Sequence, residues 1–188
     1  MEAYRAYLNK LVDRRVEVIR IRGERIKRQI VSKLTTNLEK LDREWLEQYA
    51  KGVGLDIACG EFPHGDAVGV DININTIGAD YYIESGDELL FQQHGTLDFV
   101  ITNYFDAFPN TIKVLHEWHR CLKPGGVVAI ICRDANAYET KEGPLENKNR
   151  TSLYTVKTLP QYLYRAGFNH VSVTANLPTK ALRGMAVK

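Results

Sequence analysis

Residues 54–72 read GLDIACGEFPHGDAVGVDI, and this stretch decides the fold. An apolar run over 53–58 is followed by a turn of small residues and then by a second apolar run that ends at Asp71. In open α/β sheets, ligands bind beyond the carboxyl ends of the strands, and a residue such as Gly60 lets backbone N–H groups approach them. An ionised carboxylate, such as that of Asp71, can accept hydrogen bonds from both hydroxyls of a ribose. The stretch therefore predicts a nucleoside site.

The same stretch argues against a dinucleotide. The NAD-type fingerprint G-x-G-x-x-G opens a helix whose N-terminus binds the pyrophosphate. The corresponding positions here are Ala58, Gly60 and Pro63, and the interval 59–67 is too short for a full helix. A nucleoside without a pyrophosphate is therefore favoured, and an NAD-linked function ranks below it.

Further apolar runs follow the first two, at 97–102 and 126–131. All four runs are too short for helices and too continuous for strands with one exposed face, so they indicate a parallel sheet covered on both faces. Between the last two runs, TIKVLHEWHRCLKPGG (111–126) is predicted to be a helix closed by Pro124 and two glycines.

The last part of the chain predicts a further helix and two strands. VKTLPQYLYRAGF (156–168) is expected to be helical, and HVSVTANL (170–177) and ALRGMAVK (181–188) are expected to pair as antiparallel strands. Together with the preceding runs, these elements predict an α/β fold of the doubly wound type.

Residues 1–51 are predicted to form a helical extension. Apolar residues recur there at steps of three and four, with a break near Gly23, although the β-branched patch 16–23 also fits a strand. Residues 1–50 hold 12 Lys/Arg against 8 Asp/Glu, a modest excess that favours a solvated helix face over a nucleic-acid site. We expect this extension to pack on the sheet domain or to form a homodimer.

Composition excludes several classes of protein. With 188 residues, 44% of them hydrophobic, the chain can form the core of one domain without a disulfide or a metal. Cys59, Cys121 and Cys132 lack the spacing of a zinc site, so reduced thiols, no metal and a cytoplasmic location are expected. No apolar run approaches the roughly 18 residues of a membrane span, and the N-terminal residues lack the apolar core of a signal peptide.

Four segments, taken in order, resemble the class I S-adenosylmethionine (SAM)-dependent methyltransferase family: GLDIACGEF (54–62), GVDI (69–72), LDFVITNYF (97–105) and LHEWHRCLKPGGVVAII (115–131). The resemblance covers about residues 53–188. It implies a doubly wound, mostly parallel seven-stranded sheet of Rossmann-like type, with an antiparallel closing strand and N-terminal helices. It also assigns residues 52–188 to a SAM-binding domain that transfers the methyl group of SAM.

The resemblance further implies which residues bind the cofactor. Asp56, Ala58 and Gly60 would flank its methionine end, and Asn103 would border the sulfonium through its backbone. Asp71 would bind the ribose, although it could instead cap the segment that follows it. The pair Ser85–Gly86 would lie near the adenine, although it could be a plain turn. The complete predicted cofactor site is Asp56, Ala58, Cys59, Gly60, Asp71, Ile72, Ser85, Gly86 and Asn103.

Departures from the family pattern bear on catalysis. Ala58 and Phe62 replace family glycines, and the first crossover helix is reduced to EFPHGDA (61–67), as in a branch often associated with saccharide or glycan gene clusters. A histidine that often follows the fourth strand in that branch is absent, so Asp106 and Tyr104 are the nearest candidates for a general base. A base is needed only if the acceptor is a hydroxyl or a protonated amine. The isolated histidines, His64 among them, are assigned no role.

The alternative function is a SAM-fold domain that binds cofactor or a protein partner without methyl transfer.

The polar segment 134–150 is predicted to be a loop that closes over a small polar acceptor, with a merely solvated loop as the alternative. A small metabolite, such as a saccharide or another polar metabolite, is therefore expected as the acceptor rather than a macromolecule. The side chains that could hold its carboxylate or phosphate are Arg133, Tyr138, Lys141 and Arg150, with Tyr154 as a wall.

Overall fold

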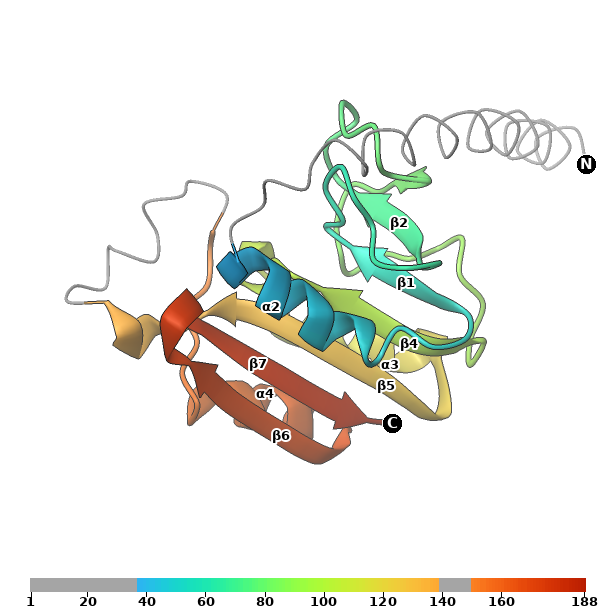
Figure 1. Ribbon diagram of the computed structural model, residues 1–188. Helices are drawn as coiled ribbons and strands as arrows, with labels where there is room; N and C mark the ends of the chain where they lie inside the picture. The colour runs from blue at the N-terminus through green and yellow to red at the C-terminus, as the bar shows by residue number, and fades with distance from the viewer. Residues whose placement is uncertain (1–36, 139–149) are drawn as a thin grey trace, which may run out of the picture.

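The computed structural model describes residues 37–138 and 150–188, which form one seven-stranded sheet (Figure 1). The strand order is β3-β2-β1-β4-β5-β7-β6, and the neighbours from β3 to β5 are parallel. Strand β7 is antiparallel to both β5 and β6. This topology confirms the predicted doubly wound sheet with an antiparallel closing strand. The strands are β1 (Gly54–Ile57), β2 (Val68–Asp71), β3 (Tyr81–Tyr82), β4 (Leu97–Thr102), β5 (Leu122–Arg133), β6 (Asn169–Asn176) and β7 (Ala181–Val187).

Helices cover the two faces of the sheet unequally. Helix α2 (Asn37–Glu47) lies on one face, and α3 (Thr111–Cys121) and α4 (Thr158–Arg165) lie on the other (Figure 1). The larger hydrophobic cluster lies under α3 and α4 and includes Trp118, Phe105 and Leu159, all with no exposed surface. A smaller cluster lies on the α2 side, where Leu46 packs near Phe99 and Ile101. Short 3₁₀ helices follow three of the strands: η1 (Phe105–Ala107), η2 (Ala135–Ala137) and η4 (Leu177–Thr179).

The connections between β1 and β4 contain no helix, and every residue of them is described. The reduction of the first crossover to 61–67 is therefore confirmed, and the next two crossovers are reduced in the same way. Since a parallel pair needs a connection that returns to the start of the next strand, these crossovers run back as turns and loops.

The helix predicted between the last two apolar runs is present, and it ends ahead of Pro124 and the two glycines, as predicted. Helix α3 ends at Cys121, and Leu122 already pairs with Leu97 in the sheet. Pro124 disfavours a helical conformation at the residue before it, so the helix ends ahead of the K-P-G-G turn. The extra residues form an irregularity in β5, where Gly125 adopts a φ of 81°.

Several predictions fall on residues outside the described ranges. The helices and the strand alternative within 1–36 are among them, as are the proposed contact of Lys141 and most of the predicted closing loop. None of the helices in the described part of the chain is long and apolar enough to cross a membrane.

Candidate functional site

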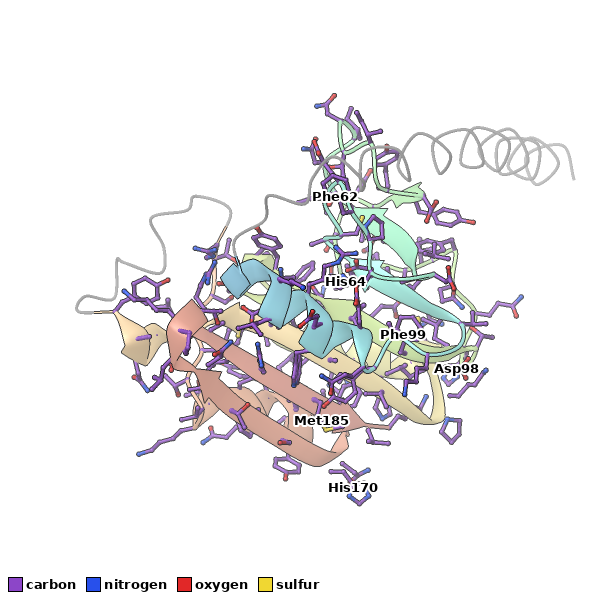
Figure 2. All side chains as sticks on the ribbon, in the orientation of Figure 1. Phe62, His64, Asp98, Phe99, His170 and Met185 are labelled. Atoms are coloured by element: carbon purple, nitrogen blue, oxygen red, sulfur yellow. The ribbon has the colours of Figure 1, made fainter. Side chains whose placement is uncertain are left out.

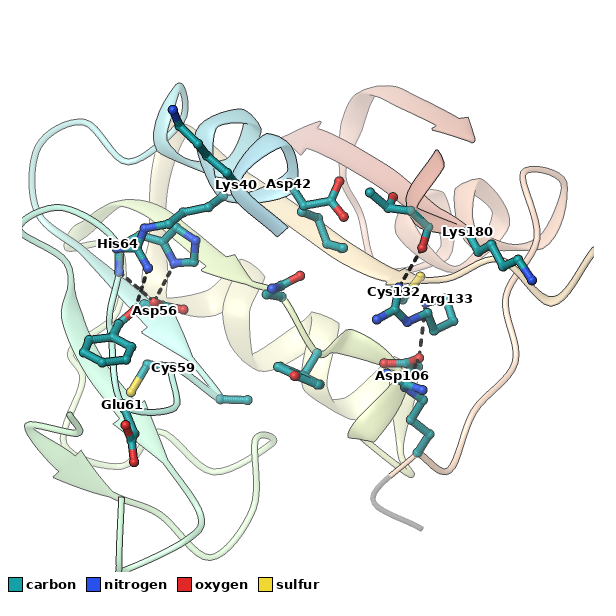
Figure 3. A pocket seen from close by; sticks show the side chains of 18 of the residues that line it. Lys40, Asp42, Asp56, Cys59, Glu61, His64, Asp106, Cys132, Arg133 and Lys180 are labelled. Atoms are coloured by element: carbon teal, nitrogen blue, oxygen red, sulfur yellow. Dashed lines mark hydrogen bonds and ion pairs between the residues drawn. The ribbon is translucent and has the colours of Figure 1, made fainter. Parts of the chain in front are cut away.

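A cavity of about 540 Å³ opens at the carboxyl ends of β1, β4 and β5 (Figure 3). The chain runs from β1 outward to β3 and then returns to β4 on the other side of β1, so this is the point at which the strand order reverses. Ligands of open α/β sheets bind at such points. Three sets of residues line the cavity: Asp56, Ala58, Cys59, Glu61, Phe62 and His64 after β1; Asn103, Tyr104, Asp106, Ile131, Cys132, Arg133 and Arg150 near β4 and β5; and Lys40, Asp42, Arg43, Pro178, Thr179 and Lys180 from α2 and η4.

The turn after β1 has the open geometry that was expected of it. Ala58 and Gly60 both adopt positive φ values, 58° and 60°, and no heavy atom lies within 4 Å of the place where a Cβ of Gly60 would stand. Asp71 at the end of β2 holds the turn, because its Oδ2 accepts the Gly60 N–H at 3.0 Å. Its Oδ1 accepts the Asn73 N–H at 2.9 Å. Asp71 therefore caps the segment that follows it, as the alternative interpretation required, and its contact with ribose stays a prediction.

Asp56 and His64 form a buried pair on the same side of the cavity (Figure 3). Oδ2 of Asp56 lies 2.8 Å from Nδ1 of His64 and also accepts the His64 backbone N–H at 2.9 Å. Their exposed fractions are 1% and 5%. The loop that holds His64 is clamped from α2, since the Arg43 guanidinium donates to the carbonyl oxygens of Phe62 and Pro63 at 3.0 and 3.1 Å.

Sequence reasoning missed His64. The residue lies eight positions after Asp56, and no local spacing rule places those two side chains in contact. The helix-free crossover turns His64 back over the end of β1. The shortness of that crossover was visible in the sequence and is the one signal that could have directed attention to its residues.

The side of the cavity that follows β4 holds the predicted base candidates. Asp106 is 2% exposed, and its Oδ2 lies 3.1 Å from Arg150 Nε and 3.2 Å from the backbone N of Arg133. Burial raises the pKa of Asp106, and the hydrogen bond from Arg133 and the charge of Arg150 oppose that rise. Tyr104 is 42% exposed and Asn103 is half-buried. Asp106 is thus the more enclosed of the two candidates.

Basic side chains approach the cavity from several elements. Arg133 on β5 donates to the carbonyl of Thr179 at 2.7 Å, which fixes its guanidinium against η4. Lys180, next to η4, lies over the ring of Tyr138 at 5.1 Å. Asp42 on α2 is paired with Arg183 at 2.8 Å, a residue outside the cavity. Among the residues that line the cavity near β4, β5, α2 and η4, positive side chains therefore outnumber negative ones.

The structure brings many of the predicted site residues together and leaves others apart. Asp56, Ala58, Cys59, Asn103, Tyr104 and Asp106 line the same cavity, as do Arg133 and Arg150. Gly60 lies in the turn after β1, and Asp71, at the end of β2, holds that turn by accepting the Gly60 N–H. Ile72, Ser85, Gly86 and Tyr138 are not among the residues that line it. Gly86 instead accepts a hydrogen bond from the Trp118 indole at 3.0 Å.

The prediction of Tyr154 as a wall of the cavity was wrong. Tyr154 is 1% exposed and packs in the larger hydrophobic cluster, with its ring 5.2 Å from that of Phe105. Its hydroxyl is hydrogen-bonded to Thr111 at 2.6 Å, and burial raises its pKa to about 12. An aromatic ring with one polar group is more stable inside the core when a partner for that group is available there.

A family model described as a methyltransferase domain matches residues 22–173, which is most of the chain. The chain belongs to this methyltransferase domain family. The predictions of a methyltransferase and of SAM as its cofactor are confirmed at the level of the family.

Solved structures agree with this family at the level of the fold. A SAM-dependent methyltransferase from Archaeoglobus fulgidus is 16% identical, with 79% of this chain and 94% of that chain covered and a TM-score of 0.64. A second, from Mesorhizobium loti, is 16% identical, with coverages of 79% and 96% and a TM-score of 0.61. Phosphoethanolamine N-methyltransferase 2 from Haemonchus contortus, solved with SAM, is 17% identical over 74% of this chain and 39% of that chain, with a TM-score of 0.60. A search of the curated proteins found no match.

The residues of this methyltransferase domain fit SAM. The space beside Gly60 would admit a ligand close to the backbone, and Asp56 Oδ1 and His64 Nε2 are buried polar atoms with no hydrogen-bond partner among the described residues. Such atoms are costly unless a ligand or water satisfies them. SAM carries no phosphate, so it does not need the helix that is missing after β1.

Proposed function

We propose that this protein transfers the methyl group of SAM to a small polar acceptor that carries a carboxylate or a phosphate. One observation carries the proposal: the turn after β1 and the enclosed Asp106 line a single cavity. A methyl donor at the turn and an acceptor beside Asp106 would therefore share one enclosed space, as direct transfer requires.

SAM supplies an electrophilic methyl group bound to a sulfonium, and the protein must orient the acceptor and remove its proton where it has one. Asp106 is the best-placed proton acceptor in the cavity, because burial raises its pKa and thereby makes the carboxylate a stronger base. Arg150 and the backbone of Arg133 hold that carboxylate in place. Tyr104 serves as a wall of the acceptor pocket, and the backbone of Asn103 borders the reacting sulfur.

The charges of the cavity support an anionic acceptor. Arg150 is paired with Asp106, but none of the described carboxylates forms an ion pair with Arg133 or Lys180. Lys40 on α2 is mostly exposed and, although it pairs with Glu44 at 3.6 Å, adds a third cation at the rim. A carboxylate or phosphate would satisfy these groups, since a guanidinium binds both with paired hydrogen bonds.

The likeness of the helix-free first crossover to the branch often associated with saccharide or glycan gene clusters makes sugar derivatives the first class to test. The other assignments from the sequence stay predictions: a helical extension over 1–51, a SAM-binding domain over 52–188, a cytoplasmic location, a homodimer through the N-terminal helices and no binding of nucleic acid.

The proposal is tested by incubating the full chain with SAM tritiated on the methyl group and a cell extract divided into small-molecule and macromolecular fractions. Label is expected in the small-molecule fraction, on an acceptor that an anion exchanger retains. Asp106→Asn is expected to lower the transfer rate on the order of 10²- to 10⁴-fold if the acceptor is a hydroxyl or a protonated amine, as is usual when a general base is lost.

Asp98→Asn is the matched control, because Asp98 lies near the start of β4, the strand that Asp106 follows. Asp98 is therefore at the opposite end of the strands from His64 and the cavity (Figure 2). The variant should leave the transfer rate unchanged. Label confined to macromolecules would contradict the small acceptor. Binding of SAM with no transfer to any fraction would favour the alternative of a cofactor-binding domain without catalysis.

A further inference from the structure

One carboxylate of the cavity wall, that of Asp42 on α2, is held through a single oxygen. Its Oδ1 accepts from Asn176 Nδ2 at 3.0 Å and from Arg183 Nε at 2.9 Å, and Arg183 Nη2 lies 2.8 Å from the same oxygen. A guanidinium often binds a carboxylate through two parallel hydrogen bonds, one to each oxygen. Here all three nitrogens meet Oδ1, and Oδ2 makes no hydrogen bond within the described part of the chain.

The unused oxygen of Asp42 is available to a ligand in the cavity. Asp42 lines the cavity, whereas Asn176 and Arg183, which hold its Oδ1, do not (Figure 3). The side chain is only 6% exposed, but Oδ2 is not among the fully buried atoms that lack a partner. The contacts at Oδ1 fix the carboxylate before a ligand arrives, and such preorganisation reduces the entropy lost on binding.

The charge of Asp42 is offset by its own partner, and this decides which kind of group Oδ2 can bind. Nη2 of Arg183 lies 2.8 Å from Oδ1, so the carboxylate already has a cationic partner. Arg133 and Lys40 are further cations that line this side of the cavity. An ammonium group at Oδ2 would meet these positive charges, and like charges brought together at a partly buried site are costly. The group that donates to Oδ2 is therefore a neutral one.

Asp42 belongs to the same wall of the cavity as Arg133, the cation that the proposed function assigns to the acceptor. On β7, Ala181 pairs with Arg133 on one side and with Asn176 on the other. The Arg133 guanidinium is fixed on the carbonyl of Thr179, and Asn176 holds Asp42. An acceptor bound to Arg133 through its carboxylate or phosphate therefore brings its neighbouring atoms toward Asp42. A hydroxyl suits this position better than an amide N–H, because its oxygen can donate to Oδ2 and still accept from the guanidinium.

We infer that Asp42 is a specificity-determining residue that accepts, at Oδ2, a hydrogen bond from a hydroxyl group of the acceptor. The inference rests on the proposed function and narrows its substrate class to anions that also carry hydroxyl groups. Asp42 selects the acceptor in this role, and Asp106 remains the proposed proton acceptor.

The test measures the affinities of two matched pairs of anions by calorimetry, on the full chain with S-adenosylhomocysteine bound. Glucose 1-phosphate is paired with cyclohexyl phosphate, and glucuronate with cyclohexanecarboxylate, so that only the first member of each pair carries ring hydroxyls. Asp42→Asn can keep an oxygen toward Arg183 while it presents N–H donors to the cavity. It should lower the ratio of the two affinities within each pair on the order of 10- to 100-fold, the loss expected for a hydrogen bond to a charged group.

Two further variants support the comparison. Asp66→Asn is the matched control, because it removes the same charge from an exposed residue outside the cavity lining, and it should leave both ratios unchanged. Asp42→Glu keeps the charge that pairs with Arg183 but displaces the free oxygen, so it should lower the ratios as well. A ratio within one variant does not depend on how much of that variant is folded, so a loss of stability cannot imitate the expected pattern.

The outcomes separate this inference from the proposed function. Ratios that stay at the wild-type value in both Asp42 variants would show that other groups bind the hydroxyls, and they would overturn the inference alone. An equal fall in Asp66→Asn, or wild-type binding of only the two hydroxyl-free anions, would overturn it as well. If the wild type bound none of the four anions, the anionic acceptor of the proposed function would be overturned together with the inference.

Discussion

The two halves of the sheet are held together by different interactions. In the half formed by β1, β2 and β3, the connections contain no helix, and buried carboxylates hold the loops by accepting backbone N–H groups. Asp56 holds His64, Asp71 holds Gly60, and Asp80 accepts the N–H of Gly69. In the half formed by β4 to β7, helices α3 and α4 pack an apolar cluster against the strands, and this cluster reaches the first half through Leu55 and Ile57 of β1, Val70 of β2 and the partly buried residues beside them.

The difference has a physical reason and a functional consequence. A helix satisfies its own backbone groups, whereas a buried loop must find partners for them elsewhere. Carboxylates provide those partners in the first half, and two of them, Asp56 and Asp71, lie at the carboxyl ends of β1 and β2, where a polar cofactor is expected. The second half provides an apolar base that fixes the position of Asp106 beside the cavity.

The largest expected effect is on the stability of the helix-covered half. Trp118 has no exposed surface, its ring packs 5.5 Å from that of Phe108, and its indole donates to Gly86 O across the two halves. Trp118→Ala should lower the free energy of unfolding by about 3–5 kcal/mol, because it leaves a large cavity. Urea denaturation followed by circular dichroism measures this loss.

The second tryptophan of the chain provides the control. Trp45 on α2 is half-buried and packs on the edge of Tyr49, so Trp45→Ala should cost on the order of 1 kcal/mol. Similar losses for the two variants would contradict the idea that apolar packing under α3 carries the stability of this half.

A smaller effect is expected in the half held by carboxylates. Asp80 is 7% exposed, and its Oδ2 accepts the Gly69 N–H at 2.8 Å. Asp80→Ala removes this acceptor from a buried N–H and should lower the free energy of unfolding by about 1–3 kcal/mol. Asp80→Asn should recover part of the loss, because the amide oxygen can still accept. The exposed Asp66→Ala is the control, and an Asn variant as unstable as the Ala variant would argue against a hydrogen-bonding role.

The smallest expected effect is a pH dependence in the helix-covered half. His119 on α3 packs edge-on against Phe168 at 5.0 Å, and burial, followed by the charge of Lys188, lowers its pKa from the ordinary 6.5. Because the folded state binds this proton less well than the unfolded state, the stability due to neutral His119 is present above pH 6.5 and is lost as the pH falls through the lowered pKa.

His119→Gln should therefore show a flatter dependence of the urea midpoint on pH than the wild type between about pH 7.5 and about 5. His94→Gln is the control, since His94 is exposed. A wild-type midpoint that rises as the pH falls, with the rise removed in His119→Gln, would give the opposite sign and would contradict the burial of the neutral ring.

The elements of the fold could be predicted from the sequence because their signals are local. The run 97–102 coincides with β4, and the small-residue turn at Gly60 appears where two short apolar runs meet. Periodicity and turn chemistry operate over a few neighbouring residues, so the chain carries them without reference to its folded shape. The resemblance to the methyltransferase family rested on four such local segments in the right order.

Only the tertiary structure decided which side chains meet in the cavity. Arg150, the last residue of the predicted closing loop, holds Asp106, whereas Tyr154, which follows that loop closely, turns into the core. The contact of His64 with Asp56 needs a helix-free crossover and a clamp from Arg43 on α2. Such contacts depend on where whole strands and helices lie, and no spacing along the chain encodes them.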